Sequence, residues 1–454
     1  MNITIVGAGI AGLSAAFELQ QSGFEVTLLE GSERLGGKIL TSEIEGFNID
    51  AGPDSFLTRD PEMRELCFSL GVGNELVPPT GKPAKVWVDG EMHSLPKRHF
   101  LGVPLDLDEL EELSILTEEG VKRAKLDLTL PDNKPKESET VGSLIRRRLG
   151  DEVMDKLVGP LLGGINAGDA DDLCLESGVP QLFNASQGDF SLVRSIQDFL
   201  KNQNKDPANP VFLTHPDGLQ TVVKRLEQEI DSNIIRNERV TSLEISNNSI
   251  VIKGSQEYQT DAVILCVPAF VAAKLLHDSC PNTSNLLANI QYASMAFITF
   301  AFNKDDVPQF NGSGFLVGKD EDLLTTACSW TSEKWAHLKN DNTVFLRLSV
   351  GRFGDKEALD MADNTLIEEL KGELATLTGI KADPIATRVT RWPNSFPQYE
   401  LGHGEKVNAL RQRATLEMPG MFLAGSPFKG IGLSACIRDG IDQARKAKNF
   451  LMQR

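Results

Sequence analysis

The first 38 residues of the chain constrain its fold more than any other stretch. A short apolar run over residues 2–6 leads into Gly7, Gly9 and Gly12, which have the G-x-G-x-x-G spacing of a turn from a strand into a helix. In such a turn the first glycine permits the tight bend, the second lets the backbone approach a pyrophosphate, and the third lets the helix pack closely on the strand. The spacing predicts a βαβ unit that binds a nucleotide, although a glycine-rich turn can also serve packing alone.

An acidic residue ends the second strand of this unit. The predicted helix over residues 13–22 directs its N-terminal amides at a phosphate, and the predicted strand over residues 24–29 delivers Glu30, eighteen residues beyond Gly12. A carboxylate at this place accepts hydrogen bonds from ribose hydroxyls and repels a 2′-phosphate. We therefore expect the site to disfavour NADP.

A basic, glycine-rich segment follows at once. Its sequence, Arg34-Leu35-Gly36-Gly37-Lys38, places two cations and a glycine doublet directly after Glu30. This pattern resembles the flavoprotein family of amine oxidases, carotenoid desaturases and porphyrinogen oxidases. The resemblance implies that the bound nucleotide is FAD.

The composition fits a large soluble enzyme with two or three domains. The 454 residues exceed the size at which single cores stop growing, about 250–300 residues. The 46 basic and 64 acidic residues give a net charge of −18, which argues against nucleic acid and against an electrostatic hold on anionic lipid. A cation that lines a pocket would therefore act against an acidic background.

Cysteine spacing indicates neither a metal site nor a redox dithiol, so no metal is predicted. The six cysteines form no C-x-x-C pair and do not cluster with the six histidines. No secretory signal precedes the first strand, and no apolar run approaches the ~18 residues that cross a bilayer. We therefore expect free thiols and a cytoplasmic protein without stable membrane insertion.

The middle of the chain changes from strands to helices. A hairpin is predicted over residues 85–95, with Asp89-Gly90 at its turn, and mainly helical structure is predicted over residues 106–200. Two polar stretches, residues 131–139 and 201–210, are predicted as loops.

The second half returns to the first sheet. A strand over residues 234–240 is expected to begin a β-meander, and several later strands are followed by a helix over residues 364–377. A glycine-rich turn over residues 425–432 and a helix over residues 433–451 end the chain. The N-terminus of that helix would favour negative charge on a nearby reduced flavin.

The predicted fold class is α/β, with a Rossmann-like FAD-binding domain, a mixed-sheet substrate-binding domain and an inserted α-helical domain. The predicted boundaries interleave: the FAD-binding domain takes residues 1–80, 206–275 and 401–454, the substrate-binding domain residues 81–105 and 276–400, and the helical domain residues 106–205.

Six further motifs make the resemblance more specific. They look like segments of the bacterial porphyrinogen oxidases of haem synthesis, and they keep their order along nearly the whole chain. Most similar is the soluble Gram-positive branch, whose members are coproporphyrinogen III oxidases. The motifs are residues 52–56 (GPDSF), 160–169 (PLLGGINAGD), 312–317 (GSGFLV), 327–330 (ACSW), 391–393 (RWP) and 397–399 (PQY).

This resemblance implies an FAD-dependent oxidation of coproporphyrinogen III to coproporphyrin III in haem b biosynthesis. Six electrons leave the porphyrinogen, FAD accepts two at a time and O2 is reduced to H2O2, so three rounds are needed. Aromatisation of the ring supplies the driving force. Because the sequence contains no convincing acid–base arrangement, no catalytic residue is predicted. Transient contact with the next enzyme of the haem pathway is expected.

The same resemblance assigns residues to the substrate and the cofactor. The four propionates of the substrate favour arginine, because a guanidinium binds a carboxylate through two parallel hydrogen bonds. The arginines beside family motifs, and hence the substrate candidates, are Arg59, Arg347 and Arg391. The implied FAD contacts are Gly7, Ala8, Gly9, Ile10, Ala11, Gly12, Glu30, Gly31, Lys38, Gly52, Pro53, Asp54, Ser55, Val240, Trp392, Ile431, Gly432 and Leu433.

Three alternatives stay open. A protoporphyrinogen IX oxidase shares much of the pattern, and a non-catalytic porphyrin-handling protein could retain FAD as a structural group. Flavin amine oxidases share the pattern of the first 38 residues, but they usually carry Ala-Gly-Glu where this chain has Ala424-Gly425-Ser426.

The chain departs from the porphyrinogen oxidase pattern at one place near the expected cofactor. Ser434-Ala435 stands where porphyrinogen oxidases commonly have proline-aspartate. The geometry of this turn near the flavin is therefore open.

Overall fold

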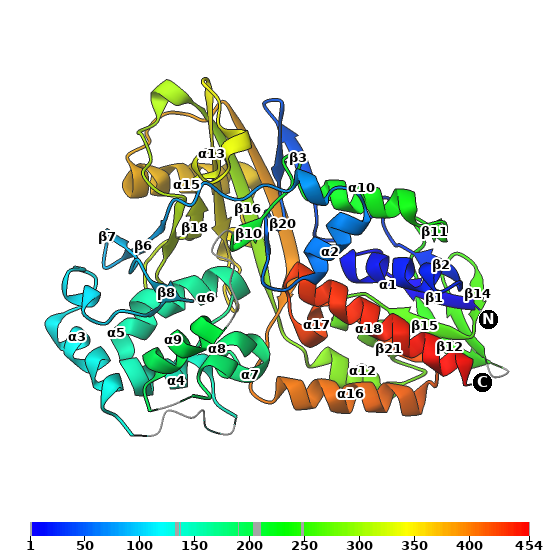
Figure 1. Cartoon of the computed structure of the whole chain (residues 1–454). Coiled ribbons are helices and arrows are strands. Elements are labelled where there is room, and N and C mark those ends of the chain that lie inside the picture. The colour runs from blue at the N-terminus through cyan, green and yellow to red at the C-terminus, as the bar shows by residue number, and fades with distance from the viewer. Residues whose placement is uncertain are drawn as a thin grey trace.

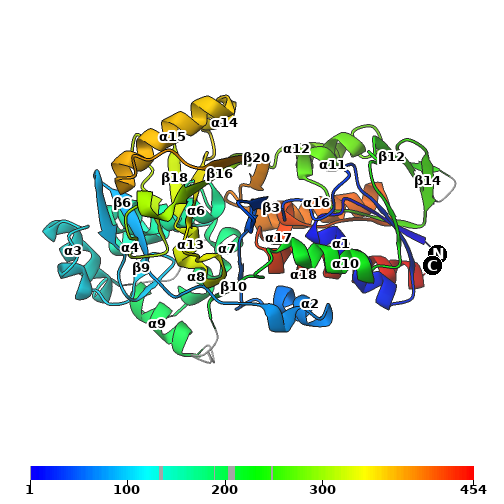
Figure 2. The ribbon, with the colours of Figure 1, turned by 90° about the horizontal axis from the view of Figure 1, so that it is seen from above.

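The computed structural model describes residues 2–131, 136, 138–188, 190–202, 210–246 and 249–453, and it has two halves (Figure 1). One half holds both chain ends and a parallel sheet, and the other holds a mixed sheet and a group of helices. Figure 2 shows the halves side by side, with strand β20 (Ala386–Pro397) near their junction. The loops predicted over residues 131–139 and 201–210 fall largely outside the described residues. The arrangement confirms the predicted α/β fold class.

The first half is built on a five-stranded parallel sheet. Helix α1 (Ile10–Gln21) follows the glycine turn and packs against the last helix, α18 (Leu433–Met452). The strands of the sheet are short and apolar, because helices or loops cover both of its faces. The strand order is β11-β2-β1-β15-β21, with bounds β1 Asn2–Val6, β2 Glu25–Leu29, β11 Asn233–Ile235, β15 Ala262–Leu265 and β21 Met421–Leu423. The beginning, middle and end of the chain thus form one sheet.

The strand predicted over residues 234–240 is shorter in the structure. β11 ends at Ile235, because the backbone of Asn237 enters the left-handed region with a φ of 57°. The Glu238 amide then donates a hydrogen bond to the Glu30 carbonyl at 2.9 Å, so the chain bends over the end of β2. The predicted meander follows as β12 (Ser242–Ser246), β13 (Ser249–Lys253) and β14 (Glu257–Thr260).

The second half contains a seven-stranded mixed sheet. Strands β17 and β6 are parallel, and the other neighbouring strands are antiparallel. The order is β20-β16-β19-β18-β17-β6-β7, with bounds β6 Ala84–Val88, β7 Glu91–Ser94, β16 Tyr292–Asn303, β17 Gly314–Val317, β18 Thr325–Ser329 and β19 Thr343–Val350. β6 and β7 form the predicted hairpin.

Alternating side chains give this sheet two different faces. Ile298, Leu346 and Leu348 pack with Leu366 and Leu370 of helix α15 (Asp363–Thr378) in one buried core. The side chains between them point to the opposite face. That second face forms a wall of the cavity described below.

Helices dominate residues 106–200, as predicted. Their apolar sides pack around a core that includes Leu144, Ile145 and Leu182. The main helices are α3 (Glu118–Lys125), α4 (Val141–Leu149), α6 (Gly159–Asn166), α8 (Pro180–Ala185) and α9 (Leu192–Asn202).

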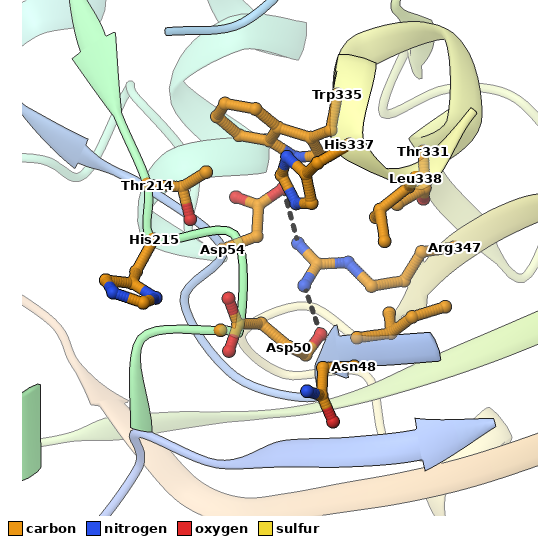
Figure 3. A pocket seen from close by; sticks show the side chains of 12 residues that line it. Asn48, Asp50, Asp54, Thr214, His215, Thr331, Trp335, His337, Leu338 and Arg347 are labelled. Carbon is orange, nitrogen blue, oxygen red and sulfur yellow. Dashed lines mark hydrogen bonds and ion pairs between the residues drawn. The ribbon is translucent and has the colours of Figure 1, made fainter. Parts of the chain in front are cut away.

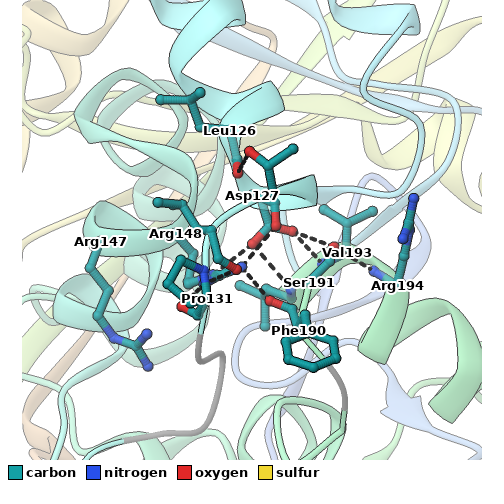
Figure 4. Close-up of polar contacts among 12 residues, drawn as sticks. Leu126, Asp127, Pro131, Arg147, Arg148, Phe190, Ser191, Val193 and Arg194 are labelled. Atoms are coloured by element: carbon teal, nitrogen blue, oxygen red, sulfur yellow. Dashed lines mark hydrogen bonds and ion pairs between the residues drawn. The ribbon is translucent and has the colours of Figure 1, made fainter.

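A buried ion pair lies inside this helical core (Figure 4). The Asp127 carboxylate accepts hydrogen bonds from Arg148 Nε at 2.7 Å and from the Ser191 hydroxyl at 2.6 Å. It also accepts the amides of Leu192 and Val193, at 3.1 and 3.0 Å, and so caps the start of α9. The charged side chains of the pair are 0% and 2% exposed, so the interaction joins three chain segments away from water.

Replacing Asp127 by asparagine should lower the free energy of unfolding by about 3–5 kcal/mol, because the Arg148 guanidinium would stay buried without its counter-ion. Denaturant unfolding measures this loss. The matched control is Asp198→Asn in α9, which removes the ion pair between Asp198 and Lys201. The side chains of these two residues are 64% and 73% exposed, respectively. That control should cost less than about 1 kcal/mol. Equal losses in the two variants would contradict the prediction.

Candidate active site

A cavity of about 1180 Å³ lies between the two sheets. Its lining includes Val6, Leu29 and Cys266, at or just beyond the carboxyl ends of β1, β2 and β15, and Met295 and Phe297 of the mixed sheet. Ligands of open α/β sheets bind in the crevice outside the carboxyl ends of the strands. The volume exceeds the roughly 300–1,000 Å³ of a pocket for one small ligand, so the cavity has room for a nucleotide and a second molecule.

The three glycines of the turn differ in the space that the protein leaves for a side chain. Gly7 has a φ of +100°, and a Cβ there would lie 2.6 Å from the Cys266 carbonyl oxygen. A Cβ on Gly12 would lie 1.9 Å from the Gly7 carbonyl oxygen, so helix α1 packs directly on the end of β1. Gly9 differs, because its Cβ would meet no protein atom within 4 Å and the residue lines the cavity. The turn thus leaves bare backbone facing the cavity.

Alanine substitutions should separate these constraints. Gly9→Ala should keep the stability of the cofactor-free protein, since the extended backbone of Gly9 (φ −70°, ψ 177°) suits alanine, but it should weaken flavin binding. Gly12→Ala should lower both the stability of the cofactor-free protein and its affinity for flavin, because α1 must move away from β1. Thermal unfolding of the cofactor-free protein and flavin titration measure the two effects. Normal flavin affinity in Gly9→Ala would contradict the prediction that the bare backbone of this turn, here called the nucleotide cradle, contacts the cofactor.

The acidic residue predicted to bind ribose lies at the cavity wall. Glu30 accepts hydrogen bonds from the Ala8 amide at 2.8 Å and from the amide and hydroxyl of Ser32 at 2.9 and 2.7 Å. These bonds hold the carboxylate beside the glycine turn. Both Glu30 and Ser32 line the cavity.

The two cations of the basic segment have different roles in the structure. Arg34 donates to the main-chain carbonyls of Leu35 and Ile39, at 3.1 and 2.7 Å, and also to Gly37, so it stabilises its own turn. Lys38 lines the cavity, and burial lowers the pKa of its ammonium group. An anion in the cavity would therefore meet Lys38 rather than Arg34.

Most of the predicted FAD contacts share this cavity. Ala8 and Gly12 lie outside its lining, because they pack behind the glycine turn. The residues that line it are Gly7, Gly9, Ile10, Ala11, Glu30, Gly31, Lys38, Gly52, Pro53, Asp54, Ser55, Val240, Trp392, Ile431, Gly432 and Leu433. Their contacts with FAD stay a prediction.

The three substrate arginines are not brought together. Arg347 lines the cavity, whereas Arg59 and Arg391 do not. Arg59 pairs with Asp60 at 3.3 Å. Arg391 pairs with Asp363 and donates to main-chain carbonyls of the segment before α15, so its charge is satisfied away from the cavity. The structure offers no support for a substrate contact by these two arginines.

Arg347 joins the mixed sheet to the turn that follows β4 (Phe47–Asp50), as Figure 3 shows. Its Nη1 donates to the carbonyls of Asp50 at 2.7 Å and Gly52 at 3.0 Å. Trp392 Nε1 donates to the Ala51 carbonyl between them at 2.7 Å. The guanidinium also lies 4.8 Å from the ring centre of Phe297. Two side chains of the mixed sheet thus position a turn of the first half.

Asp54 carries a charge within this contact. Its carboxylate lies 2.7 Å from Lys334 Nζ and 3.4 Å from Arg347 Nη2. Burial opposes ionisation of Asp54, but these two cations overcome it and hold the pKa well below its ordinary value. Asp54 therefore stays ionised at neutral pH.

Asp50 behaves differently from Asp54. Burial raises the pKa of the Asp50 carboxyl from its ordinary 3.8 to about 7, and the charge of Asp54 adds to the increase. Hydrogen bonds from the Thr41 hydroxyl at 2.6 Å and the Leu219 amide at 3.1 Å oppose this shift without cancelling it. Asp50 therefore changes charge close to neutral pH.

This raised pKa predicts a pH-dependent stability. Between pH 3.8 and about 7 the folded protein keeps a proton on Asp50 that the unfolded chain releases, so the free energy of unfolding falls as pH rises through this window. Relative to Asp50→Asn, which mimics the neutral acid, the wild type should lose about 1.4 kcal/mol per pH unit between pH 5 and 7 and level off above. Denaturant unfolding at several pH values tests this. A constant difference between the two proteins would contradict it.

The C-terminal turn over residues 425–432 is more ordered than predicted. It contains the short helix α17 (Ser426–Lys429), and Tyr399 braces that helix at both ends. The Tyr399 hydroxyl donates to the Ser426 carbonyl at 2.5 Å and accepts the Gly430 amide at 2.7 Å. Asp439 accepts the Gly425 amide at 2.9 Å while it is paired with Arg411. These contacts place Ile431, Gly432 and Leu433 at the cavity wall.

The unusual Ser434 has a defined role. Its hydroxyl donates to the Asp60 carbonyl at 3.0 Å and accepts the Met63 amide at 3.3 Å, so it connects α18 to helix α2 (Glu62–Ser69). Ala435 presents only a methyl group against the neighbouring Gly430. Helix α18 thus starts at the cavity wall with Ser434 and Ala435 in its first turn.

Several cavity residues were missed by sequence reasoning. Arg239 and Lys274 add cations to the side lined by the parallel sheet, and Ser329, Ser349 and Ser395 add hydroxyls to the side lined by the mixed sheet. The positions of the serines depend on how distant strands pair, whereas Arg239 lies in a loop and Lys274 in helix α11 (Ala269–Leu276). Strand alternation alone could have marked Ser329 and Ser349, since each lies between residues of the α15 core.

Comparisons with known proteins identify the family. A profile described as "Flavin containing amine oxidoreductase" matches residues 10–447. The chain belongs to this family and is an oxidoreductase, in agreement with the predicted FAD cofactor.

Individual relatives are more specific. The chain is 33% identical over 464 residues to a coproporphyrinogen III oxidase of Bacillus subtilis, with 99% of this chain and 98% of the relative covered. It is 25% identical to the chloroplastic protoporphyrinogen oxidase 1 of Arabidopsis thaliana, with 98% and 88% covered. A solved structure from Exiguobacterium sp. 255-15 has a TM-score of 0.89 and 29% identity, with 100% of this chain and 99% of that chain covered. The predicted resemblance to coproporphyrinogen III oxidases of Gram-positive bacteria is confirmed.

Proposed function

We propose that this protein uses FAD to oxidise coproporphyrinogen III to coproporphyrin III, with O2 as electron acceptor, in the coproporphyrin-dependent route to haem b. The observation that carries the proposal is a single cavity that joins a nucleotide cradle to a wall of the mixed sheet. The full-length similarity to a protein named coproporphyrinogen III oxidase supports this substrate.

The residues present suit FAD. The space beside Gly9 would admit a pyrophosphate, Glu30 would accept ribose hydroxyls, and Lys38 would offset negative charge. Bound FAD accepts two electrons from an organic substrate at a time. The chain's own contribution is to fix the glycine turn through Gly12 and to hold the 50–54 turn through Arg347.

The reaction needs no dedicated acid or base on this chain. Oxidation of the porphyrinogen by three O2 yields porphyrin and three H2O2, so the six electrons and six protons are balanced without a further reactant. Aromatisation favours proton loss. Among the described residues, the carboxylates that line the cavity are Glu30, Asp54 and Glu238, and each is held by neighbouring donors or cations. We assign them to positioning.

The protoporphyrinogen reaction is the second candidate, because the Arabidopsis relative carries that name. An amine oxidase is less well supported, since Ser426 replaces the glutamate that such enzymes usually carry at this place and its carbonyl accepts a hydrogen bond from Tyr399.

Among the described residues, no helix is long and apolar enough to cross a bilayer. All six cysteines are unpaired, which supports a reducing cytoplasmic setting. Contact with the next pathway enzyme stays a prediction.

Aerobic turnover of the FAD-loaded protein tests the proposal. Coproporphyrinogen III and protoporphyrinogen IX should be compared in parallel by porphyrin fluorescence and peroxide production. We expect preference for the first substrate, with about three peroxides per porphyrin. Preference for protoporphyrinogen IX would favour the second candidate, and turnover of neither would refute both.

A further inference from the structure

The cavity wall formed by the mixed sheet is mostly apolar, with a few polar side chains at specific places. Met295 and Phe297 of β16 lie between the strand residues that face α15, and Ala327 and Ser329 of β18 lie on the same cavity face. Arg347 of β19 is the cation of this wall. A ring-shaped apolar ligand could pack here, and any charged substituent would need one of the polar positions.

Ser329 is one of two serines on this wall whose hydroxyl has an unmet hydrogen bond. Its hydroxyl is buried and has no hydrogen-bond partner among the described residues. Unpaired buried hydroxyls are costly, so each requires an explanation such as a ligand. Ser349 on the neighbouring strand also lines the cavity, but its hydroxyl accepts from Thr326 Oγ1 at 3.2 Å and donates to the Ala327 carbonyl at 3.4 Å. Of the three serines on this wall, Ser349 is therefore bonded within the sheet, whereas the hydroxyls of Ser329 and Ser395 have no partner among the described residues.

The strand register places Ser329 beside a positive charge. Ser329 and Arg347 are directly opposite each other in the β18–β19 pair, so their side chains leave the sheet on the same face. Arg347 and Lys334 share the Asp54 carboxylate, which leaves one positive charge in excess within this group while the neighbouring Asp50 carboxyl is protonated. Ser395 of β20 is also buried and unpartnered, but it lies near Trp392 and has no such cation as its strand partner.

We propose that the Ser329 hydroxyl donates a hydrogen bond to a carboxylate of the ring substrate, beside the excess positive charge of Arg347 and Lys334. This proposal rests on the porphyrinogen function proposed above and makes it more specific. Arg347 itself is held by the carbonyls of Asp50 and Gly52, so it attracts the carboxylate chiefly through its charge. Ser329 supplies the directed contact, and it distinguishes an acidic side chain of the ligand from a neutral one.

The test compares two porphyrins with the FAD-loaded protein. Coproporphyrin III carries four carboxylates, and its tetra-amide has the same ring without negative charge. Quenching of porphyrin fluorescence gives the dissociation constant of each. We expect Ser329→Ala to weaken coproporphyrin III binding roughly tenfold, as for the loss of a hydrogen bond to a charged group, and to leave the tetra-amide unchanged.

The matched control is Ser349→Ala, which removes a hydroxyl from the same wall that is already bonded within the sheet. It should change the affinity for the two porphyrins by the same factor. The flavin content of Ser329→Ala should match the wild type and its melting temperature should not fall, which separates a ligand contact from a folding defect.

Three results would overturn the proposal. Ser329→Ala could bind coproporphyrin III as the wild type does, it could weaken the acid and the amide equally, or Ser349→Ala could show the same preference for the amide. If the wild type oxidises coproporphyrinogen III in any of these cases, the Ser329 assignment alone fails. If the wild type neither oxidises porphyrinogens nor binds coproporphyrin III, the proposed function fails as well.

Discussion

The contact between Arg347 and the turn after β4 holds the two halves of this protein around their shared cavity. A guanidinium suits this position because its fixed geometry lets one nitrogen bond the carbonyls of Asp50 and Gly52 while another faces Asp54. Trp392 adds a hydrogen bond to the carbonyl of Ala51. Since the contact comes from the mixed sheet and its target from the first half, the shape of the cavity depends on both. Burial of these groups makes their pairing obligatory.

The local parts of the fold were predictable because short segments of sequence encode them. The glycine spacing located β1, α1 and β2, since Gly7 and Gly12 stand where a side chain would collide with the main chain of the turn or of the segment just beyond β15. The alternation of apolar and polar residues located the hairpin of β6 and β7. The helical spacing of apolar residues located α15. The strand after residue 233 was predicted too long, because the bend at Asn237 is set by hydrogen bonding to Glu30 from a distant segment.

The candidate site was predictable only where a motif carries it. The glycine turn, Glu30 and Lys38 belong to one continuous segment, and the structure lines a cavity with them. Arg59 and Arg391 were chosen because they lie beside motifs, but sequence proximity does not specify which way a side chain points, and both pair outside the cavity. The raised pKa of Asp50 arises from burial between segments far apart in sequence, which no motif could have reported. The interleaved domain boundaries stay a prediction.

The last strand and helix complete the first sheet, and this has a consequence for synthesis of the protein. β21 pairs with β15, and α18 covers α1, so a chain still on the ribosome exposes the apolar side of α1 until its final segment has emerged. A messenger truncated near its end would yield a chain with an uncovered apolar helix, which is the kind of surface that chaperones and proteases recognise.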